Sequence, residues 1–154
     1  MRVYIVQHGQ AKSKDADPDR HLTDKGARDV QKVTGLLRPL GLKVEQIRHS
    51  GKARARQTAE ILSAGLSTVS GVVQCDGLGP TDPVEKTVEE LNGASEDLMI
   101  VGHLPFMSKL AGALLASAAA GEPIAFQQGG VVCLQKNDDS SWRVRWMVVP
   151  GIIS

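Results

Sequence analysis

Residues 2–9 read RVYIVQHG, a short run of apolar and β-branched residues that ends in His8-Gly9. An apolar run of this kind, without polar alternation, is typical of a strand that is buried on both faces of a sheet. Residues 44–50 (VEQIRHS) and 97–102 (DLMIVG) are further candidate strands, and the second of them leads directly into His103. Two histidines therefore follow the carboxyl ends of candidate strands.

Apolar residues at helical spacing fill the intervals between these strands. The first such helix begins at Thr23, whose hydroxyl suits an N-cap, and ends at Gly41. Further helices are predicted over 52–66, 84–91 and from Pro105 to about Ala119, and further strands over 72–75, 125–135 and 142–149. In the last strand Trp142, Val144 and Trp146 alternate with arginines, which predicts one buried face.

The alternation of strands and helices predicts an α/β fold, a three-layer sandwich with a largely parallel sheet flanked by helices. The chain has 154 residues, 42% of them hydrophobic, and shows neither an internal repeat nor a linker. That length and composition suit a single domain over residues 1–154 with a core of its own.

The charge and cysteine content exclude several classes of partner. A net charge of +1 gives no overall field for binding nucleic acid or an anionic membrane surface. No stretch approaches the roughly 18 continuous apolar residues of a transmembrane helix, and residues 1–6 read as a strand and not as a signal peptide. Cys75 and Cys133 are far apart and lack metal-ligand spacing. We therefore expect reduced structural thiols in a cytoplasmic protein.

The carboxyl ends of parallel strands are where α/β proteins bind their ligands. His8 and His103 follow two such ends, and Ser50 and Arg54 follow a third, so we expect the two histidines and Arg54 to converge. Taken alone, either histidine could be an ordinary structural residue. The four histidines of the chain form no HxH, HExxH or i,i+4 pair, so we expect no metal site.

Four blocks of sequence together resemble the histidine phosphatase superfamily, which includes cofactor-dependent phosphoglycerate mutase and acid phosphatases. They are QHG at 7–9, LTDKG at 22–26, SGKARARQTA at 50–59 and VGHLP at 101–105. Their order and spacing are similar to the short, SixA-type branch of phosphohistidine phosphatases. The resemblance extends over essentially the whole chain.

The resemblance implies a catalytic set of His8, Arg54 and His103. His8 is then the nucleophile that takes up the phosphoryl group, Arg54 binds the phosphate and His103 donates to a phosphate oxygen. A neutral imidazole can attack phosphorus, and cationic donors stabilise the charge on the transferred group. We expect nearby positive charge to lower the pKa of His8 and keep it neutral. Neither a metal nor an organic cofactor is expected.

The remaining phosphate-binding residues implied are Gln7, Gly9 and Arg20. Gln7 departs from the family motif, which reads Arg-His-Gly, and keeps amide donors but loses the charge. Arg20 is the candidate to compensate for that loss. No residue matches the carboxylic acid of the mutase-type members, and Asp82, in a loop, is the possible proton donor.

The sequence thus predicts a metal-independent hydrolase that acts through a covalent phosphohistidine, on phosphohistidine of a partner protein. The short connections at 8–22 and 76–83 leave no segment for a lid, which favours a protein substrate over a small phosphate ester. One alternative is a small-molecule phosphomonoesterase or mutase. Another is a phosphate-binding module without turnover, with Gln7 as the sign of lost activity.

Overall fold

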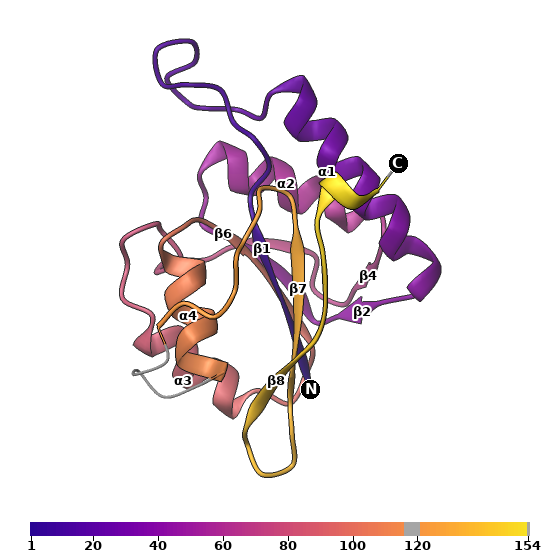
Figure 1. Ribbon diagram of the computed structural model, residues 1–154, viewed down its shortest axis with the longest axis vertical. Helices are drawn as coiled ribbons and strands as arrows, with labels where there is room; N and C mark the ends of the chain where they lie inside the picture. The colour runs from indigo at the N-terminus through magenta and orange to yellow at the C-terminus, as the bar shows by residue number, and fades with distance from the viewer. Residues whose placement is uncertain (116–120, 154) are drawn as a thin grey trace.

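The computed structural model describes residues 1–115 and 121–153. Strands and helices alternate along most of this chain, as predicted (Figure 1). In order, the elements are β1 Arg2–Gln7, α1 Asp24–Leu37, the 3₁₀ helix η1 Arg38–Leu40, β2 Lys43–Val44, β3 Gln46–His49, α2 Ala53–Ser63, β4 Ser67–Thr68, β5 Val72–Gln74, α3 Glu85–Gly93, β6 Leu98–Gly102, α4 Phe106–Leu115, β7 Val131–Lys136, β8 Trp142–Val148 and the 3₁₀ helix η3 Pro150–Ile152.

The central sheet is mixed but mostly parallel, in agreement with the prediction. Within the described residues it has six strands in the order β5-β3-β6-β1-β7-β8. The first four strands in that order are parallel to one another, whereas β7 runs antiparallel to β1 and β8 antiparallel to β7. The carboxyl ends of β1, β3 and β6 therefore lie side by side at one edge of the sheet.

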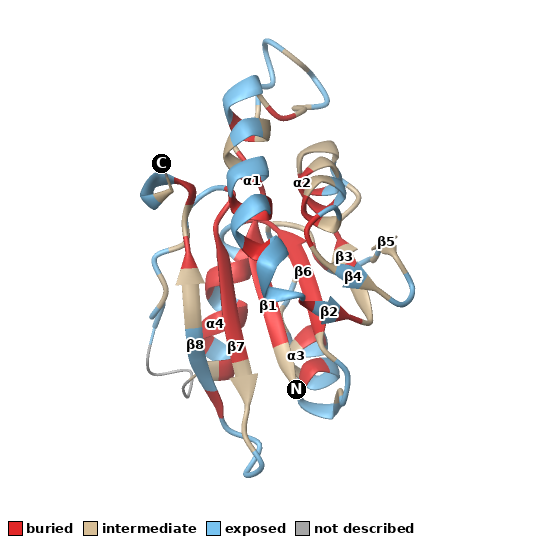
Figure 2. Cartoon of the chain, turned by 90° about the vertical axis from the view of Figure 1, so that its right-hand side faces the viewer, coloured by how far each residue is buried: buried red, intermediate tan, exposed pale blue. Residues whose placement is uncertain are grey.

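Helices cover both faces of this sheet, which makes the fold a three-layer sandwich. Helices α1 and α2 pack on one face, and α3 and α4 on the other (Figure 2). Strand β1 serves both layers, because Tyr4 and Val6 belong to the α1–α2 core while Val3 and Ile5 belong to the α3–α4 core. This double burial explains why β1 is apolar without alternation.

Helix α1 begins at the predicted cap, but the α-helix ends at Leu37, and η1 continues the segment to the predicted end at Gly41. The Thr23 hydroxyl accepts a hydrogen bond from the Gly26 backbone N–H and caps the helix. At the other end, Gly41 follows η1 with a left-handed backbone, φ 61°. Because glycine has no Cβ, Gly41 adopts this conformation without steric cost.

Two predicted strands are shorter than expected. Residues 44–50 do not form one strand, because Val44 pairs with Thr68 in a separate two-stranded sheet and β3 begins only at Gln46. The strand predicted over 125–135 begins only at Val131. Gly129 adopts φ 77° in a turn, and its N–H donates to the Gln7 carbonyl. Strand β7 begins only after this turn.

The predicted alternation in the last strand is also wrong. The register of β7 and β8 shifts between Cys133 and Leu134, which leaves one residue of β8 unpaired. A bulge of this kind turns the following side chains to the other face of the sheet. Trp142 consequently packs with the α3–α4 core and Trp146 with the α1–α2 core, while Val144 is 43% exposed.

Helix α4 covers residues 106–115, and the remainder of the helix predicted to about Ala119 lies outside the described residues. Among the helices that the structure describes, none has both the length and the apolarity needed to cross a bilayer.

Candidate active site

The carboxyl ends of β1 and β6 bring His8 and His103 together. The backbone N–H of His8 donates to the Gly102 carbonyl at 3.0 Å, which continues the pairing of Gln7 with Gly102 between β1 and β6. The two imidazole rings are tilted by 54°, with 5.0 Å between their centroids. The predicted convergence of these two side chains is confirmed.

The His8 ring is held with one nitrogen free. Its Nδ1 lies 2.7 Å from the Gly9 carbonyl oxygen, an acceptor, so Nδ1 carries the proton and Nε2 keeps its lone pair. Burial lowers the pKa of His8 to about 4; the Gly9 carbonyl opposes this shift, and the charges of Arg54 and Arg20 add to it. We predicted that charge would keep His8 neutral; charge contributes, but burial is the larger cause.

His103 is almost fully buried and is positioned by Ser50. The Ser50 hydroxyl oxygen lies 2.6 Å from His103 Nε2, while Nδ1 is buried without a partner in the described residues. Burial lowers the pKa of His103 to about 3, with smaller contributions from His8, Arg54, Lys52 and Arg20. If the hydroxyl donates to Nε2, the proton of the neutral ring is on Nδ1, an unsatisfied donor.

Arg54 lies in the first turn of α2, where the helix approaches this pair of histidines. Its Nε atom is buried and has no hydrogen-bond partner among the described residues. Burial lowers the pKa of Arg54, and the charge of Arg20 lowers it further. A buried guanidinium N–H without a partner is costly unless an anion completes it.

Arg20 lies on the long loop between β1 and α1 and lines a cleft beside the two histidines, whose pKa values its charge helps to lower; His8 and His103 are not among the residues that line this cleft. Its backbone is left-handed, φ 53°, and its Nε donates to the Lys12 carbonyl at 3.1 Å. The Leu22 N–H donates to Gln57 Oε1 at 2.8 Å, which ties this loop to α2. Arg20 and Arg54 therefore face one cleft, as predicted.

The cleft has a volume of about 620 Å³ and is strongly basic. It is open to solvent at Lys14, Lys52 and Arg56, which are exposed. Its lining residues are Lys14, Pro18, Asp19, Arg20, His21, Gly51, Lys52, Ala53, Arg54 and Arg56.

Gly9 and Thr58 fix the turn that presents His8. Gly9, which we predicted to bind phosphate, donates its N–H to the Thr58 hydroxyl at 3.0 Å. That hydroxyl in turn donates to the Arg54 carbonyl at 2.8 Å. Thr58 thus links the nucleophile's turn to the helix that carries the phosphate-binding arginine. Thr58 lies within the block RARQTA, but its type and spacing alone gave no sign of this role.

Gln7, the last residue of β1, is buried, and its side-chain Oε1 has no partner among the described residues.

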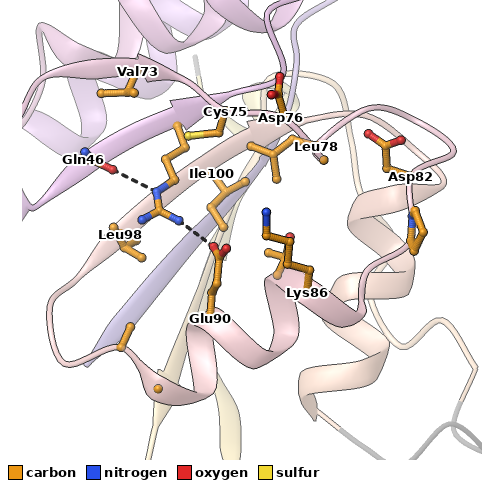
Figure 3. A pocket seen from close by; sticks show the side chains of 16 residues that line it. Gln46, Val73, Cys75, Asp76, Leu78, Asp82, Lys86, Glu90, Leu98 and Ile100 are labelled. Atoms are coloured by element: carbon orange, nitrogen blue, oxygen red, sulfur yellow. Dashed lines mark hydrogen bonds and ion pairs between the residues drawn. The ribbon is translucent and has the colours of Figure 1, made fainter.

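Figure 3 shows that Asp82 lies elsewhere, in the wall of a different hollow of about 820 Å³ beside α3, with Lys86 and Glu90. Its Oδ2 accepts from the Gly79 N–H at 2.8 Å. The structure does not bring Asp82 into the cleft of Arg20 and Arg54.

The other two histidines hold local structure. His49 is buried, and its Nδ1 accepts from the Gly51 N–H at 3.1 Å. His21 Nδ1 lies 2.7 Å from Asp17 Oδ2, and with Asp19 this pair forms a group with ligand atoms within 4.8 Å of one another. Such a group could hold a cation; our expectation of no metal site considered only the spacing of the histidines and not these carboxylates. His21 and Asp19 line the cleft, and His8 and His103 are not members of the group.

Comparisons with known proteins agree with this geometry. A model of the histidine phosphatase superfamily (branch 1) matches residues 3–79, half of the chain. An uncharacterised protein of Picosynechococcus is 35% identical over 143 residues, covering 88% of this chain and 85% of the relative. The protein histidine phosphatase SixA, solved with tungstate, aligns with a TM-score of 0.84 at 22% identity over 98% of both chains. A mycobacterial glucosyl-3-phosphoglycerate phosphatase, solved with VO3, aligns with a TM-score of 0.70 at 19% identity, over 94% of this chain and 97% of that chain.

Proposed function

The chain belongs to the histidine phosphatase superfamily, and we propose that it is a phosphatase that acts through a phosphohistidine on His8. One observation carries the proposal. Arg54 Nε and His103 Nδ1 are both buried without partners among the described residues, in one site with the free nitrogen of His8. An oxyanion such as a phosphoryl group satisfies both donors at once.

In the proposed reaction, His8 Nε2 attacks phosphorus. A P–N bond forms to His8 and the bond from phosphorus to the leaving group breaks, with the electron pair going to the leaving group. Water then attacks phosphorus, the electron pair of the P–N bond returns to His8 Nε2 and inorganic phosphate is released. One proton of the water leaves with the phosphate, and the other replaces, through solvent, the proton that the leaving group takes up. Because burial keeps His8 neutral well below pH 7, its lone pair is available without a separate base.

Arg54, His103 and Arg20 stabilise the negative charge on the three equatorial oxygens during both steps. We propose Gln7 as a further, neutral donor. A half-turn of its amide exchanges Oε1 and Nε2, which puts an N–H group where the unpartnered oxygen lies. These donors supply positive charge from side chains alone, so we propose that the reaction needs no metal and no organic cofactor.

The proposed substrate is phosphohistidine on a partner protein. The cleft is bordered by exposed side chains, which suits a phosphorylated group that projects from a folded surface. Imidazole leaves more readily than an alkoxide once it is protonated, so such a substrate has little need of a strong general acid. This agrees with the position of Asp82, held by Gly79 outside the cleft.

A small phosphate ester is the second candidate. The likeness to the glucosyl-3-phosphoglycerate phosphatase favours it, although at 19% identity that likeness concerns the fold. A binding module without turnover is a third candidate, since Gln7 lacks the charge that the family has at this position.

We further propose that residues 1–154 act as one domain and that the protein is cytoplasmic, consistent with the free thiols of Cys75 and Cys133.

A turnover assay on a phosphohistidine protein, beside phosphoglycerate and sugar phosphates, tests the proposal. We expect phosphate release in excess over enzyme, with kcat/KM at least about a hundredfold higher for phosphohistidine. EDTA should leave the rate unchanged. A sugar phosphate as the best substrate would favour the second candidate, and phosphate release that stops short of one equivalent would favour the third. Loss of activity in EDTA with recovery in a divalent cation would contradict the metal-free mechanism.

A further inference from the structure

Three cations at the mouth of the cleft lie outside the phosphate-binding set. Lys52 and Arg56 belong to the start of α2, and Lys14 belongs to the loop between β1 and α1. All three are exposed, and we call them the basic rim. Asp19 is the one acidic residue among the residues that line the cleft. The rim therefore carries positive charge that a bound phosphoryl group alone does not neutralise.

The charge of this region contrasts with that of the chain as a whole. Five of the lining residues are Lys or Arg, yet the formal net charge of the protein is only +1. The remainder of the molecule is thus net negative. Such a distribution attracts an anionic partner to the cleft in particular and repels it elsewhere.

The rim is unfavourable for the helix on which it lies. Lys52 is the N-cap of α2, and the first turn contains Arg54 and no acidic residue. The positive end of the helix dipole lies there, so cations reduce helix stability and carboxylates would increase it. Arg56 gains little locally, because its Nε lies 3.8 Å from Glu60 Oε1 with both side chains about half exposed. Residues that oppose local stability are expected at functional sites.

The rim is also close to the chemistry. The charge of Lys52 is among the causes that lower the pKa of His103. An anion bound at Lys52 is therefore within electrostatic reach of the phosphoryl site. The cleft, at about 620 Å³, is also larger than a single phosphoryl group requires.

We infer that the basic rim, Lys14, Lys52 and Arg56, binds carboxylates that flank the phosphorylated residue of a protein substrate. This inference rests on the proposed function and names its substrate class as an acidic phosphorylated segment. Exposed lysine and arginine side chains suit carboxylates spread along a surface, since their long stems can adapt to several positions. A small ligand with a second phosphate is the competing occupant.

Two phosphohistidine peptides of equal length test the inference, one with Asp and Glu beside the phosphorylated residue and one with Asn and Gln. At about 0.01 M ionic strength we expect wild-type kcat/KM to be about tenfold higher for the acidic peptide, and the preference to shrink at about 0.15 M. The double variant Lys52→Gln/Arg56→Gln should lose the preference and keep its rate on the neutral peptide. Its thermal stability should not fall, because the removed charges oppose the helix dipole.

The matched control is Lys86→Gln/Lys109→Gln, which removes the same charge from exposed positions on α3 and α4 and should keep the preference. Equal wild-type rates on the two peptides, or a preference that survives in Lys52→Gln/Arg56→Gln, would overturn the inference. A bisphosphate ligand that inhibits turnover of the neutral peptide more strongly than the acidic peptide does would also overturn it.

Binding of the same peptides to His8→Ala protein separates this inference from the proposed function. There we expect the acidic peptide to bind about tenfold more tightly at low salt, with the difference removed by Lys52→Gln/Arg56→Gln. Tighter binding of the acidic peptide without wild-type turnover of either would end the proposed function and leave the inference standing. Turnover of both peptides without any difference in binding would support the proposed function and overturn the inference.

Discussion

At the scale of single residues, the site combines neutral imidazoles with donors that lack partners. His8 and His103 are both buried, and burial is the main reason why their pKa values lie near 4 and near 3. A protonated imidazole in this position would have to give up its hydration without gaining an anion. The folded protein therefore keeps both rings neutral at the pH where a nucleophile is needed.

The same burial predicts how stability depends on pH. The unfolded chain protonates both histidines as the pH falls through about 6.5, whereas the folded protein takes up these protons only near pH 4 and 3. The unfolded state thus binds more protons between these values. We expect the free energy of unfolding to fall as the pH drops below 6.5, by on the order of 1 kcal/mol per pH unit for each histidine.

Urea unfolding at pH 7, 6 and 5 measures this effect. A His103→Gln variant should show a shallower pH dependence than the wild type, because one of the buried histidines with a lowered pKa is gone. His21, which is half-exposed on Asp17, serves as the comparison, since His21→Gln removes a histidine that is not buried. Equal slopes for the wild type and His103→Gln would show that His103 is not a buried neutral group.

Arg54 offers the sharpest separation of activity from stability. Its Nε has no partner among the described residues, so Arg54→Met strands no hydrogen-bonding group of the protein. We expect kcat/KM to fall by about 10²–10³, the loss of one donor to the transition state. We expect the free energy of unfolding not to fall, because the variant removes a buried donor that has no partner among the described residues.

The control for Arg54→Met is Arg28→Met, at an exposed position of α1, which should change neither quantity. An Arg54→Met enzyme with near-normal kcat/KM, or one that loses stability as well as activity, would assign Arg54 to the structure and not to phosphate.

At the scale of secondary-structure elements, close packing holds the turn after β1 between α1 and α2. Thr58 of α2 accepts from the Gly9 N–H, and Gly26 of α1 lies against the backbone of Gln10. A Cβ added to Gly26 would clash with the Gln10 carbonyl oxygen. The backbone that α1 approaches at Gly26 is therefore this loop.

Substitution of two glycines of α1 tests this arrangement. Gly26→Ala should lower the free energy of unfolding by at least about 2 kcal/mol, because the backbone of Gln10 must move. It should also reduce activity, since Gln10 follows the His8-Gly9 turn. Gly35→Ala is the matched control in the same helix: its added Cβ meets nothing within 4 Å, so it should stabilise the protein by about 0.5–1 kcal/mol.

Thermal or urea unfolding gives the stability of both variants, and kcat/KM gives their activity. A Gly26→Ala protein as stable and active as Gly35→Ala would mean that the contact between α1 and the loop is not tight.

At the scale of the whole molecule, the topology explains which parts of the site could be predicted from sequence. Strand β1 is apolar on both faces, and its neighbour β6 is too, so the central sheet and the histidines at its edge followed from composition and order. The bulge that separates Trp142 from Trp146 could not be predicted, because it depends on the pairing of β7 with β8.

The side chains that position the catalytic groups were likewise beyond prediction. Thr58 bonds Gly9 across 49 positions of the chain, and Ser50 bonds His103 across 53. Hydrogen bonds over such distances depend on how the elements pack, which no local pattern encodes. The role of Asp82 as a proton donor stays a prediction, and its place outside the cleft does not favour it.

The account depends most directly on a covalent phosphohistidine at His8. Rapid quench of wild-type protein mixed with a radiolabelled phosphoryl donor should trap label that is acid-labile and base-stable, in the peptide that contains His8. The label should form at least as fast as phosphate is released, and His8→Ala should show neither label nor turnover. Label on another residue, or turnover in His8→Ala at the wild-type rate, would contradict the proposed mechanism.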